Sequence, residues 1–412
     1  TAVGTELLNA NKIENITTLA PELSAQASAL LHTITPVIIS SISSDHERAV
    51  LAALPFLTAY VSYVKSQPAL LASAQPALTT ACQALIARGA FPLEEVAEFD
   101  WNDGSNALTQ EFEADIFNLR AELSVQFRNI ARLVPQLARE VVRQVLSSAI
   151  PISIDSQKSV RWQNIEVAVS ALYTLGEGAD DAAVKPMSLA ERAQATNGTG
   201  DVSDTPLGAL AISLIKQWGP NVAHAARHRI VAPIFLETCV RYHSVLERDD
   251  EALMLALTAF LDERGIQHTD QTVRARACYL FSRLCRPLRC KLSDRVEDIM
   301  RVLPNRLAEA AQSIPDTSSR VASQVSAAGV QSKAMADGGN DDRLYLFDAS
   351  GILLGADEVP ETQQRDFLTQ IATALVNQIE SAMDQSNAID EAIRVTLATR
   401  AIVALGKISK GF

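Results

Sequence analysis

The sequence has few aromatic residues and no pattern typical of β-structure. Phe, Trp and Tyr make up only 5% of the 412 residues, whereas apolar residues as a group make up 48%, with Ala and Leu dominant. Ala and Leu are among the best helix formers because they lose little side-chain freedom in a helix. We find no regular alternation of apolar and polar residues of the kind expected in half-buried strands. The composition therefore predicts an all-α protein.

Long apolar runs and a cysteine framework are also missing. We find no apolar run that reaches the roughly 18 residues needed to cross a bilayer, and so expect no membrane partner. The five cysteines are odd in number and lack framework spacing, which indicates reduced thiols of the cytosol or nucleus. The sequence begins at Thr1 without an initiator Met or a signal peptide, so we expect a middle stretch of a longer protein.

No pattern of catalytic or metal-binding residues stands out. There is neither a Walker A loop nor a Gly-X-Ser-X-Gly elbow. His224 and His228 would share a helix face at a spacing that can bind zinc, but Arg227 and Arg229 flank the pair and disfavour a cation. Cys278 lies in an arginine-rich segment but has no partnered histidine that would make it a nucleophile. We predict no catalytic residue, no metal, no cofactor and no enzymatic activity.

Helical spacing of apolar residues runs through almost the whole chain. Val50, Leu54, Leu57 and Val61 are one example. The helices fall into antiparallel pairs, predicted as 18–43 with 45–66, 68–89 with 106–133, 134–149 with 157–177, 206–218 with 229–247, 249–265 with 270–287, 292–313 with 341–356, and 360–386 with 388–410.

Two local signals mark where helices start. Ser44 and Glu47 have the spacing of a capping box. Pro360 stands where a first-turn proline would open a helix, because its missing N–H costs nothing there.

There are about seven such pairs, and each takes up ~55–60 residues. This length per pair exceeds the ~40–47 residues of a HEAT-type repeat. Polar insertions at 91–105, 176–206 and 313–342 account for the excess, and we expect them to be flexible because they hold too few apolar residues to fold alone. No helix pair buries its apolar stripe unaided, so stacked pairs share one core. We therefore predict a single right-handed α-solenoid over residues 1–412, with apolar surface exposed at both ends.

The charge is strongly uneven along the chain. The net charge of −12 taken alone argues against nucleic acid, since phosphate binding is largely electrostatic. Residues 1–120, however, carry five basic and thirteen acidic side chains, and residues 264–306 carry ten basic and four acidic ones. This distribution suits a scaffold with two differently charged partners, and two solvated faces would explain it equally well.

The helix expected over 270–287 holds much of the basic cluster. Arg276 and Arg283 lie two turns apart and within about 20° of each other on a flank of its apolar stripe. Two guanidinium groups so placed can each bind a phosphate or carboxylate bidentately. We expect the second helices of the pairs to line the concave side. The candidate ligand-binding residues there are Arg241, Arg274, Arg276, Arg283 and Arg286.

The alternative is that these arginines bridge neighbouring helices. Salt links to residues such as Glu237 or Asp262 would use the same guanidinium groups to hold the array together. The sequence leaves both interpretations open.

Several stretches resemble the exportin-T family of tRNA exportins, in the importin-β superfamily. Residues 256–265, Ala-Leu-Thr-Ala-Phe-Leu-Asp-Glu-Arg-Gly, running on to 273–283, resemble the signature middle region of that family. Residues 235–242 and 166–173 are similar to the helices that precede it, and residues 341–352 resemble the helix that follows. The resemblance covers about residues 130–410 well and residues 1–130 weakly.

The resemblance implies a superhelix that binds tRNA and Ran in its GTP state in the nucleus and releases the cargo after GTP hydrolysis in the cytoplasm. It also implies a monomer that shuttles between the two compartments and contacts nuclear pore proteins. The family holds Ran chiefly through N-terminal repeats, so this stretch is expected to supply only part of the binding surface. A candidate second contact for Ran, or else a plain solvated loop, is the acidic set Glu94, Glu95, Glu98, Asp100 and Asp103.

Two rival functions stay open. One is an importin-β-type receptor with a protein cargo, which would bind a folded or signal-bearing protein. The other is a HEAT-repeat scaffold outside nuclear transport, which would not respond to Ran.

Overall fold

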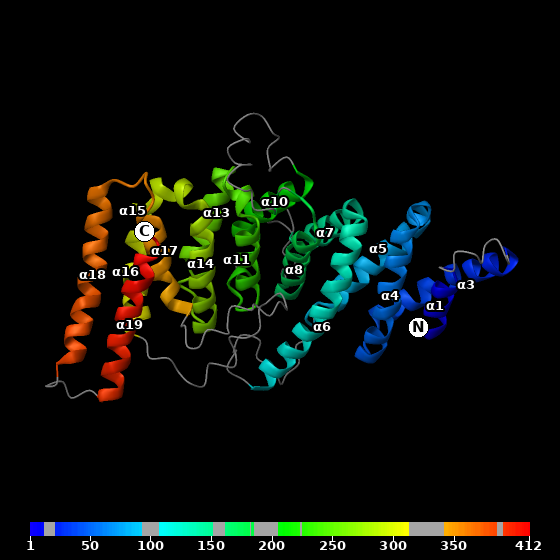
Figure 1. Ribbon diagram of the computed structural model, residues 1–412, viewed down its shortest axis with the longest axis horizontal. Coiled ribbons are helices and arrows are strands. Elements are labelled where there is room, and N and C mark those ends of the chain that lie inside the picture. Colours follow the sequence, from blue (N-terminus) through cyan, green and yellow to red (C-terminus); the bar gives the residue numbers. More distant parts are fainter. Residues whose placement is uncertain are drawn as a thin grey trace.

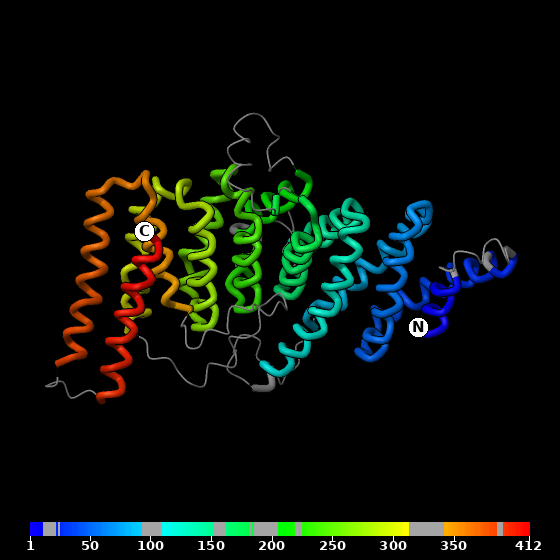
Figure 2. Tube along the Cα trace, in the orientation of Figure 1, coloured from blue at the N-terminus to red at the C-terminus, as the bar shows by residue number. Residues whose placement is uncertain are grey.

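The protein is a row of α-helices stacked side by side along one long axis (Figure 1). The structure is a computed structural model and describes residues 1–11, 21–92, 107–150, 161–181, 183–184, 205–222, 225–312, 342–384 and 390–412. Within these ranges the regular structure is helical and contains no strand, so the all-α prediction is confirmed. The trace runs from the N-terminal helices at one end of the row to the last two helices at the other (Figure 2).

Seven of the described helices form one continuous series, here called row B, in which each helix packs against the next. Row B consists of α4 (Glu47–Ser66), α6 (Ala107–Leu133), α8 (Trp162–Gly178), α11 (Val231–Arg241), α14 (Gln271–Leu292), α17 (Tyr345–Leu354) and α19 (Glu391–Ser409).

A second series, here called row A, packs in the same way and alternates with row B along the sequence. Row A consists of α3 (Pro21–Ser40), α5 (Leu71–Arg88), α7 (Pro135–Ala149), α10 (Pro206–Asn221) and α13 (Asp250–Leu261). Beyond α13, the helices α15 (Val296–Val302), α16 (Pro304–Gln312) and α18 (Glu361–Met383) pack on α17 or α19 of row B. Two rows of alternating helices are the expected architecture of a solenoid of helix pairs.

The predicted helix ranges agree broadly with the structure, but α13 ends at Leu261 instead of residue 265 and α14 continues to Leu292 instead of ending at residue 287. Three further differences concern whole helices. Helix α1 (Ala2–Asn11) packs on α3 and α4 but was not predicted. The helix predicted over 292–313 is divided into α15 and α16, because Pro304 starts a new helix. The helix predicted over 229–247 breaks at Tyr242 into α11 and the short α12 (His243–Leu246). The handedness of the array and the number of repeats stay predictions.

One predicted helix start is right and one is wrong. Pro360 directly precedes α18. Ser44 does not cap α4, because that helix begins only at Glu47 and its N-cap residue is His46. The Ser44 hydroxyl instead accepts a hydrogen bond from the backbone N–H of His46 at 3.2 Å.

Most of the three predicted insertions lies outside the described residues. At the edge of the second one, however, α8 continues through Gly178. The boundary at residue 176 is therefore wrong by three residues, because Gly176 and Gly178 are needed as small residues inside a buried last turn.

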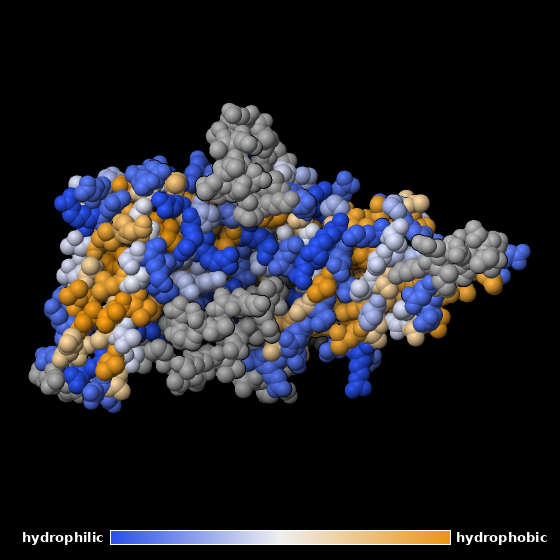
Figure 3. All heavy atoms as spheres, in the orientation of Figure 1, coloured by the Kyte–Doolittle hydropathy of each residue, from blue (hydrophilic) through white to orange (hydrophobic). Residues whose placement is uncertain are grey.

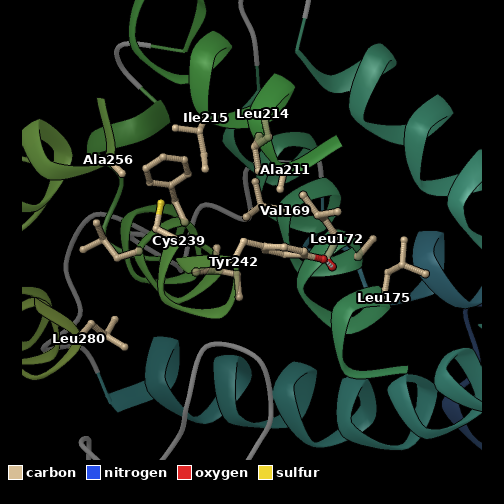
Figure 4. Packing of buried hydrophobic residues seen from close by; sticks show 14 of the residues in the cluster. Val169, Leu172, Leu175, Ala211, Leu214, Ile215, Cys239, Tyr242, Ala256 and Leu280 are labelled. Carbon is tan, nitrogen blue, oxygen red and sulfur yellow. Dashed lines mark hydrogen bonds between the residues drawn. The ribbon is translucent and has the colours of Figure 1, made fainter. Parts of the chain in front are cut away.

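The core lies between the two rows (Figure 4). Tyr242 at the end of α11 is fully buried, and its hydroxyl donates a hydrogen bond to the Leu172 carbonyl of α8 at 3.0 Å. A Cβ atom at Gly176 would lie 2.7 Å from that hydroxyl, so a glycine allows α8 and α11 to approach closely. Trp218 of α10 stacks on Phe235 of α11 with ring centroids 3.8 Å apart, which ties row A to row B.

A buried ion pair joins three helices near the middle of the array. Arg120 of α6 and Glu166 of α8 pair in bidentate fashion, at 2.6 and 2.9 Å, with both side chains buried. The Arg120 Nε also donates to the Gly89 carbonyl at the end of α5, at 3.0 Å. A buried pair of this kind contributes little net stability, but losing one partner leaves an uncompensated charge and costs about 3–5 kcal/mol.

Contrary to expectation, three helical stretches are long and apolar enough to cross a membrane by length and composition. They are Ala25–Ser43, Glu47–Ser66 and Pro68–Arg88, with mean hydropathy between 1.2 and 1.3. At most 50% of each stretch is buried in this structure. The expectation that no such run exists is therefore wrong, and the absence of a membrane partner stays a prediction.

Apolar side chains are exposed at both ends of the array, as expected. On α3, Leu23, Leu30 and Val37 are each about 60% exposed and lie at seven-residue spacing on one helix face. At the other end Met383 of α18 and Ile402 of α19 are similarly exposed. Hydrophilic residues dominate the middle of the face seen in Figure 3, and apolar residues appear toward both ends.

Backbone rather than side chain fills the contact between α17 and the end of α19. A Cβ atom at Gly351 would lie 2.2 Å from the Ile408 carbonyl oxygen, and one at Gly411 would lie 2.1 Å from the Gly351 carbonyl carbon. A neighbouring helical residue, Gly406, has nothing within 4 Å of the same position. Only the first two glycines are therefore required by packing.

We predict that Gly351→Ala destabilises the α17–α19 contact by about 2 kcal/mol, because overpacking against backbone has no easy relief. Gly406→Ala is the matched control and should be neutral or stabilising by up to about 1 kcal/mol. Hydrogen exchange of the α17 and α19 amides, together with thermal denaturation, measures both effects. Equal behaviour of the two variants would contradict the close contact.

Candidate functional site

The five candidate arginines all lie on row B. Arg241 ends α11, and Arg274, Arg276, Arg283 and Arg286 belong to α14. The apolar stripe predicted for α14 is buried, since Val273, Ala277, Leu280 and Leu284 all belong to the core. The structure divides the arginines by the bonds that their guanidinium groups make.

Arg241 links three successive helices of row B. Its guanidinium lies over the ring of Tyr173 of α8, 4.0 Å from the centroid, and pairs with Glu177 at 3.1 Å. Arg128 of α6 pairs with the same carboxylate at 2.6 Å. Burial raises the pKa of Tyr173 and the nearby Glu237 raises it further, which outweighs the lowering by Arg241, so the Tyr173 hydroxyl stays protonated.

Arg276 makes the corresponding link between α11 and α14. Its Nε and Nη2 both reach Oε1 of Glu237, at 3.0 and 2.7 Å. Glu237 is buried, and Arg276 is about one-quarter exposed. Burial would lower the pKa of Arg276, but the adjacent Glu237 outweighs it and the pKa is raised. The prediction that this arginine forms a salt bridge to a neighbouring helix is confirmed for Glu237. Asp262, the other residue named as a partner, pairs with Arg264 instead.

Two tyrosines continue the arrangement from α14 to α19. The rings of Tyr279 and Tyr345 meet edge to face with centroids 5.1 Å apart. Arg276 and Arg283 lie 5.0 and 5.9 Å from the Tyr279 ring centroid, and the ammonium of Lys407 lies 3.6 Å from that of Tyr345. Burial lowers the pKa of Lys407, although the carboxylate of Asp348 works against it.

Arg283 is the most available of these cations. It is exposed, and its only hydrogen bond to a described residue goes to the Tyr279 hydroxyl at 3.4 Å. In the described part of the chain no carboxylate pairs with it. A cation held over an aromatic ring but lacking an ionic partner is free to bind an external anion.

Arg286 and Arg274 lie at the two sides of this arrangement. Arg286 is exposed and pairs with Asp348 of α17 at 3.2 Å, and the same carboxylate accepts a hydrogen bond from Ser282. Arg274 points to the loop before α14. It donates to the carbonyl of His268 at 2.8 Å and pairs with Glu309 of α16 at 3.2 Å.

Together these groups form a chain of contacts, here called the cation–tyrosine strip, which runs along row B from α6 to α19 and in which Glu237 and Lys407 are buried. It consists of Arg128, Tyr173, Glu177, Glu237, Arg241, Arg276, Tyr279, Arg283, Tyr345 and Lys407. Sequence reasoning found three of its arginines and missed the tyrosines. Tyr279 and Arg283 are separated by one helical turn, a signal that the sequence does carry.

Some sequence-predicted sites cannot be placed. The acidic set from Glu94 to Asp103 lies outside the described residues, as does His224. Among the residues that the structure does describe, no group of three His, Cys, Asp or Glu side chains is close enough to hold a metal ion. Cys278 is buried.

His228 packs inside the array instead of facing solvent. Its ring stacks on Trp162 with centroids 4.0 Å apart, and its Nδ1 accepts a hydrogen bond from the Ile230 N–H at 3.3 Å. Burial lowers its pKa to about 3, with smaller contributions from Arg229 and His268. The histidine is therefore neutral at physiological pH, and its Nε2 is a buried group without a partner.

The family of the chain follows from comparison with known proteins. The model of the Exportin-T family matches residues 21–412. The chain belongs to the Exportin-T family. The match extends well into the first 130 residues, where the resemblance by motif is weak.

Relatives in distant organisms give the same result. The chain is 26% identical to Exportin-T of Arabidopsis thaliana, over all of this chain and 37% of that protein. It is 25% identical to Exportin-T of Aspergillus terreus, over 97% of this chain and 36% of that protein. It is 26% identical to Exportin-T of Homo sapiens, over 73% of this chain and 28% of that protein. The matched stretch thus covers between 28% and 37% of the length of these three relatives.

We predict that Arg276→Met destabilises the α11–α14 joint by about 3 kcal/mol, because it removes the guanidinium that pairs with the buried Glu237 carboxylate. Arg283→Met is the matched control, because Arg283 lies two turns further along the same helix. It should change the free energy of unfolding by less than about 0.5 kcal/mol. Urea unfolding followed by circular dichroism distinguishes them. Comparable losses would mean that Arg283 also has a structural role.

The neutral, buried His228 predicts a pH-dependent stability. Folding lowers the pKa of His228 from about 6.5 to about 3. As the pH falls below about 6.5, the histidine therefore becomes protonated in the unfolded chain but not in the folded one. The folded state loses stability over this range, down to about pH 3. The slope should approach about 1.4 kcal/mol per pH unit. His228→Asn keeps an acceptor for the Ile230 N–H and removes the titration. Urea unfolding at about pH 7.5 and about pH 5, followed by tryptophan fluorescence, should show a flatter dependence for the variant. An unchanged slope would assign the loss to other groups.

Proposed function

We propose that this chain is part of a nuclear export receptor that carries tRNA in a complex with Ran in its GTP state, and that the cation–tyrosine strip lies against the RNA. The observation that carries the proposal is the strip itself, in a chain of the Exportin-T family. The receptor acts by binding and releasing its cargo and has no enzymatic activity.

The chemistry of the strip suits a nucleic-acid backbone. The guanidinium groups of Arg241, Arg276 and Arg283 are held over tyrosine rings, which fixes their positions, and a tyrosine ring does not neutralise their charge. Contacts from Arg and Lys to phosphate position a protein on RNA and carry no sequence information. A carrier that must accept many different tRNAs requires this kind of contact.

The two carboxylates of the strip limit its affinity. Glu177 and Glu237 neutralise part of the positive charge of Arg128, Arg241 and Arg276. Arg283 is therefore the principal phosphate contact, with Arg286 beside it. Affinity from so few free cations is modest, in keeping with a chain that spans little more than a third of its relatives.

The remaining partners are part of the same proposal. Ran in its GTP state contacts this stretch through the acidic residues between Glu94 and Asp103. Arg274 remains a candidate contact beside the strip. The receptor works as a monomer, shuttles between nucleus and cytoplasm, and contacts nuclear pore proteins on the way.

The decisive measurement is tRNA binding by the full-length protein with and without Ran-GTP, at several salt concentrations. We expect Ran-GTP to increase tRNA affinity, and Arg283→Glu to reduce tRNA affinity by about tenfold and to lower the salt slope by about one. Arg301→Glu is the matched control, because Arg301 is exposed, pairs only with Glu297 and Asp298 on its own helix, and lies outside the strip.

Two outcomes would overturn the proposal. If tRNA affinity does not depend on Ran-GTP, the protein is a scaffold or a receptor for a protein cargo. If Arg283→Glu and Arg301→Glu behave alike, the strip does not face the RNA. The circular-dichroism signal of each variant shows whether it is folded.

A further inference from the structure

An apolar groove separates α16 from α18. These two helices pack mainly on α17 and α19, and the Gln378 side chain of α18 donates a hydrogen bond to the Ala311 carbonyl of α16 at 2.9 Å. The space that remains between them amounts to about 580 Å³. The groove is independent of the cation–tyrosine strip, with which it shares no residue.

The floor of the groove is apolar. Phe347 of α17, Leu307 and Ala311 of α16, and Ile371 and Leu375 of α18 contribute to it. These last two are the only buried residues of α18 in its 23 positions, so the helix is poorly covered along its length. Cavities of this size and composition are typical of binding sites.

The dimensions suit a helix. The residues of α18 that line the groove run from Phe367 to Ala382, which is four turns, or about 22 Å. The groove is open to solvent and flanked by helices, so an additional amphipathic helix lying in it would complete the packing. Laying an apolar helix face into such a groove is a common mode of peptide recognition.

The charge of the groove favours a ligand of opposite charge. Among the residues that the structure describes, its lining holds no Asp, Glu, Lys or His side chain and one cation, Arg394. The Nη1 of Arg394 donates to the Asp384 carbonyl at 3.2 Å, and its buried Nε has no hydrogen-bond partner within the described ranges. A carboxylate is the acceptor that a guanidinium edge binds best. A basic segment would meet an unfavourable charge at the same place.

We propose that this groove docks an amphipathic helical segment of a partner protein, about four turns long, with apolar side chains on one face and an acidic side chain that pairs with Arg394. The site would give the receptor a protein-binding surface separate from its proposed RNA surface.

The test uses two fluorescein-labelled peptides of about 16 residues, a length set by the helical rise. Both carry leucines at positions 1, 4, 8 and 11 of a helix-forming sequence, about the period of one helix face. One has glutamates beside the stripe, and the other has lysines at the same positions. Fluorescence anisotropy with the whole chain measures binding of each peptide, and we expect the acidic peptide to bind about tenfold more tightly, since one charge-assisted pair is gained.

Variants of the groove make the test specific. Ala374→Trp fills the groove from an exposed position and should abolish binding of the acidic peptide, whereas Val376→Trp, on the same helix but outside the lining, should not. Arg394→Glu should reverse the preference in favour of the lysine peptide. Its control, Arg365→Glu, lies on α18 outside the groove and should leave the preference unchanged.

Equal binding of the two peptides by the wild-type chain would overturn the charge assignment. Unchanged binding by Ala374→Trp would overturn the groove as the site, and binding of neither peptide would overturn the proposal as a whole. Helical circular dichroism of each variant confirms folding, and the preference reversal in Arg394→Glu is a gain that an unfolded variant does not produce. None of these outcomes depends on tRNA or Ran binding.

Discussion

The structure depends on ion pairs placed at successive joints of row B. Arg120–Glu166 joins α6 to α8, Arg241–Glu177 joins α8 to α11, and Arg276–Glu237 joins α11 to α14. Arg286–Asp348 then joins α14 to α17. Apolar contacts drive the stacking, but they are non-directional, and charge pairs of this geometry fix which turn of one helix faces which turn of the next.

The same charges give the array its candidate function. A guanidinium that bridges two helices and lies over a tyrosine is positioned before any ligand arrives, so little side-chain freedom is lost on binding. The carboxylates that hold Arg241 and Arg276 also reduce what those cations offer to a phosphate. Structural and binding roles therefore compete within one strip, and only Arg283 is spared the structural one.

The sequence predicts the helices well because their signal is local. Helical periodicity, the helix start at Pro360 and the apolar stripe of α14 can be recognised without knowledge of tertiary contacts. The pairing of Arg276 with Glu237 is one of the two interpretations that the sequence leaves open. The remaining features depend on residues far apart in sequence. Arg120 pairs with Glu166 across 46 positions, and Tyr279 meets Tyr345 across 66. The groove beside α18 was not predicted because it arises where α16 and α18 pack mainly on α17 and α19, which no local pattern records.

The glycine contact between α17 and α19 has a mechanical consequence. Where backbone touches backbone, as at Gly351 and Ile408, one helix has almost no freedom to slide or tilt on the other. Where long arginine side chains bridge the gap, as between α11 and α14, a joint can yield by small rotations of several bonds. Stiffness is therefore graded along the array, so that a change in curvature would concentrate in the arginine-bridged middle while the segment containing α17 and α19 moves as one block.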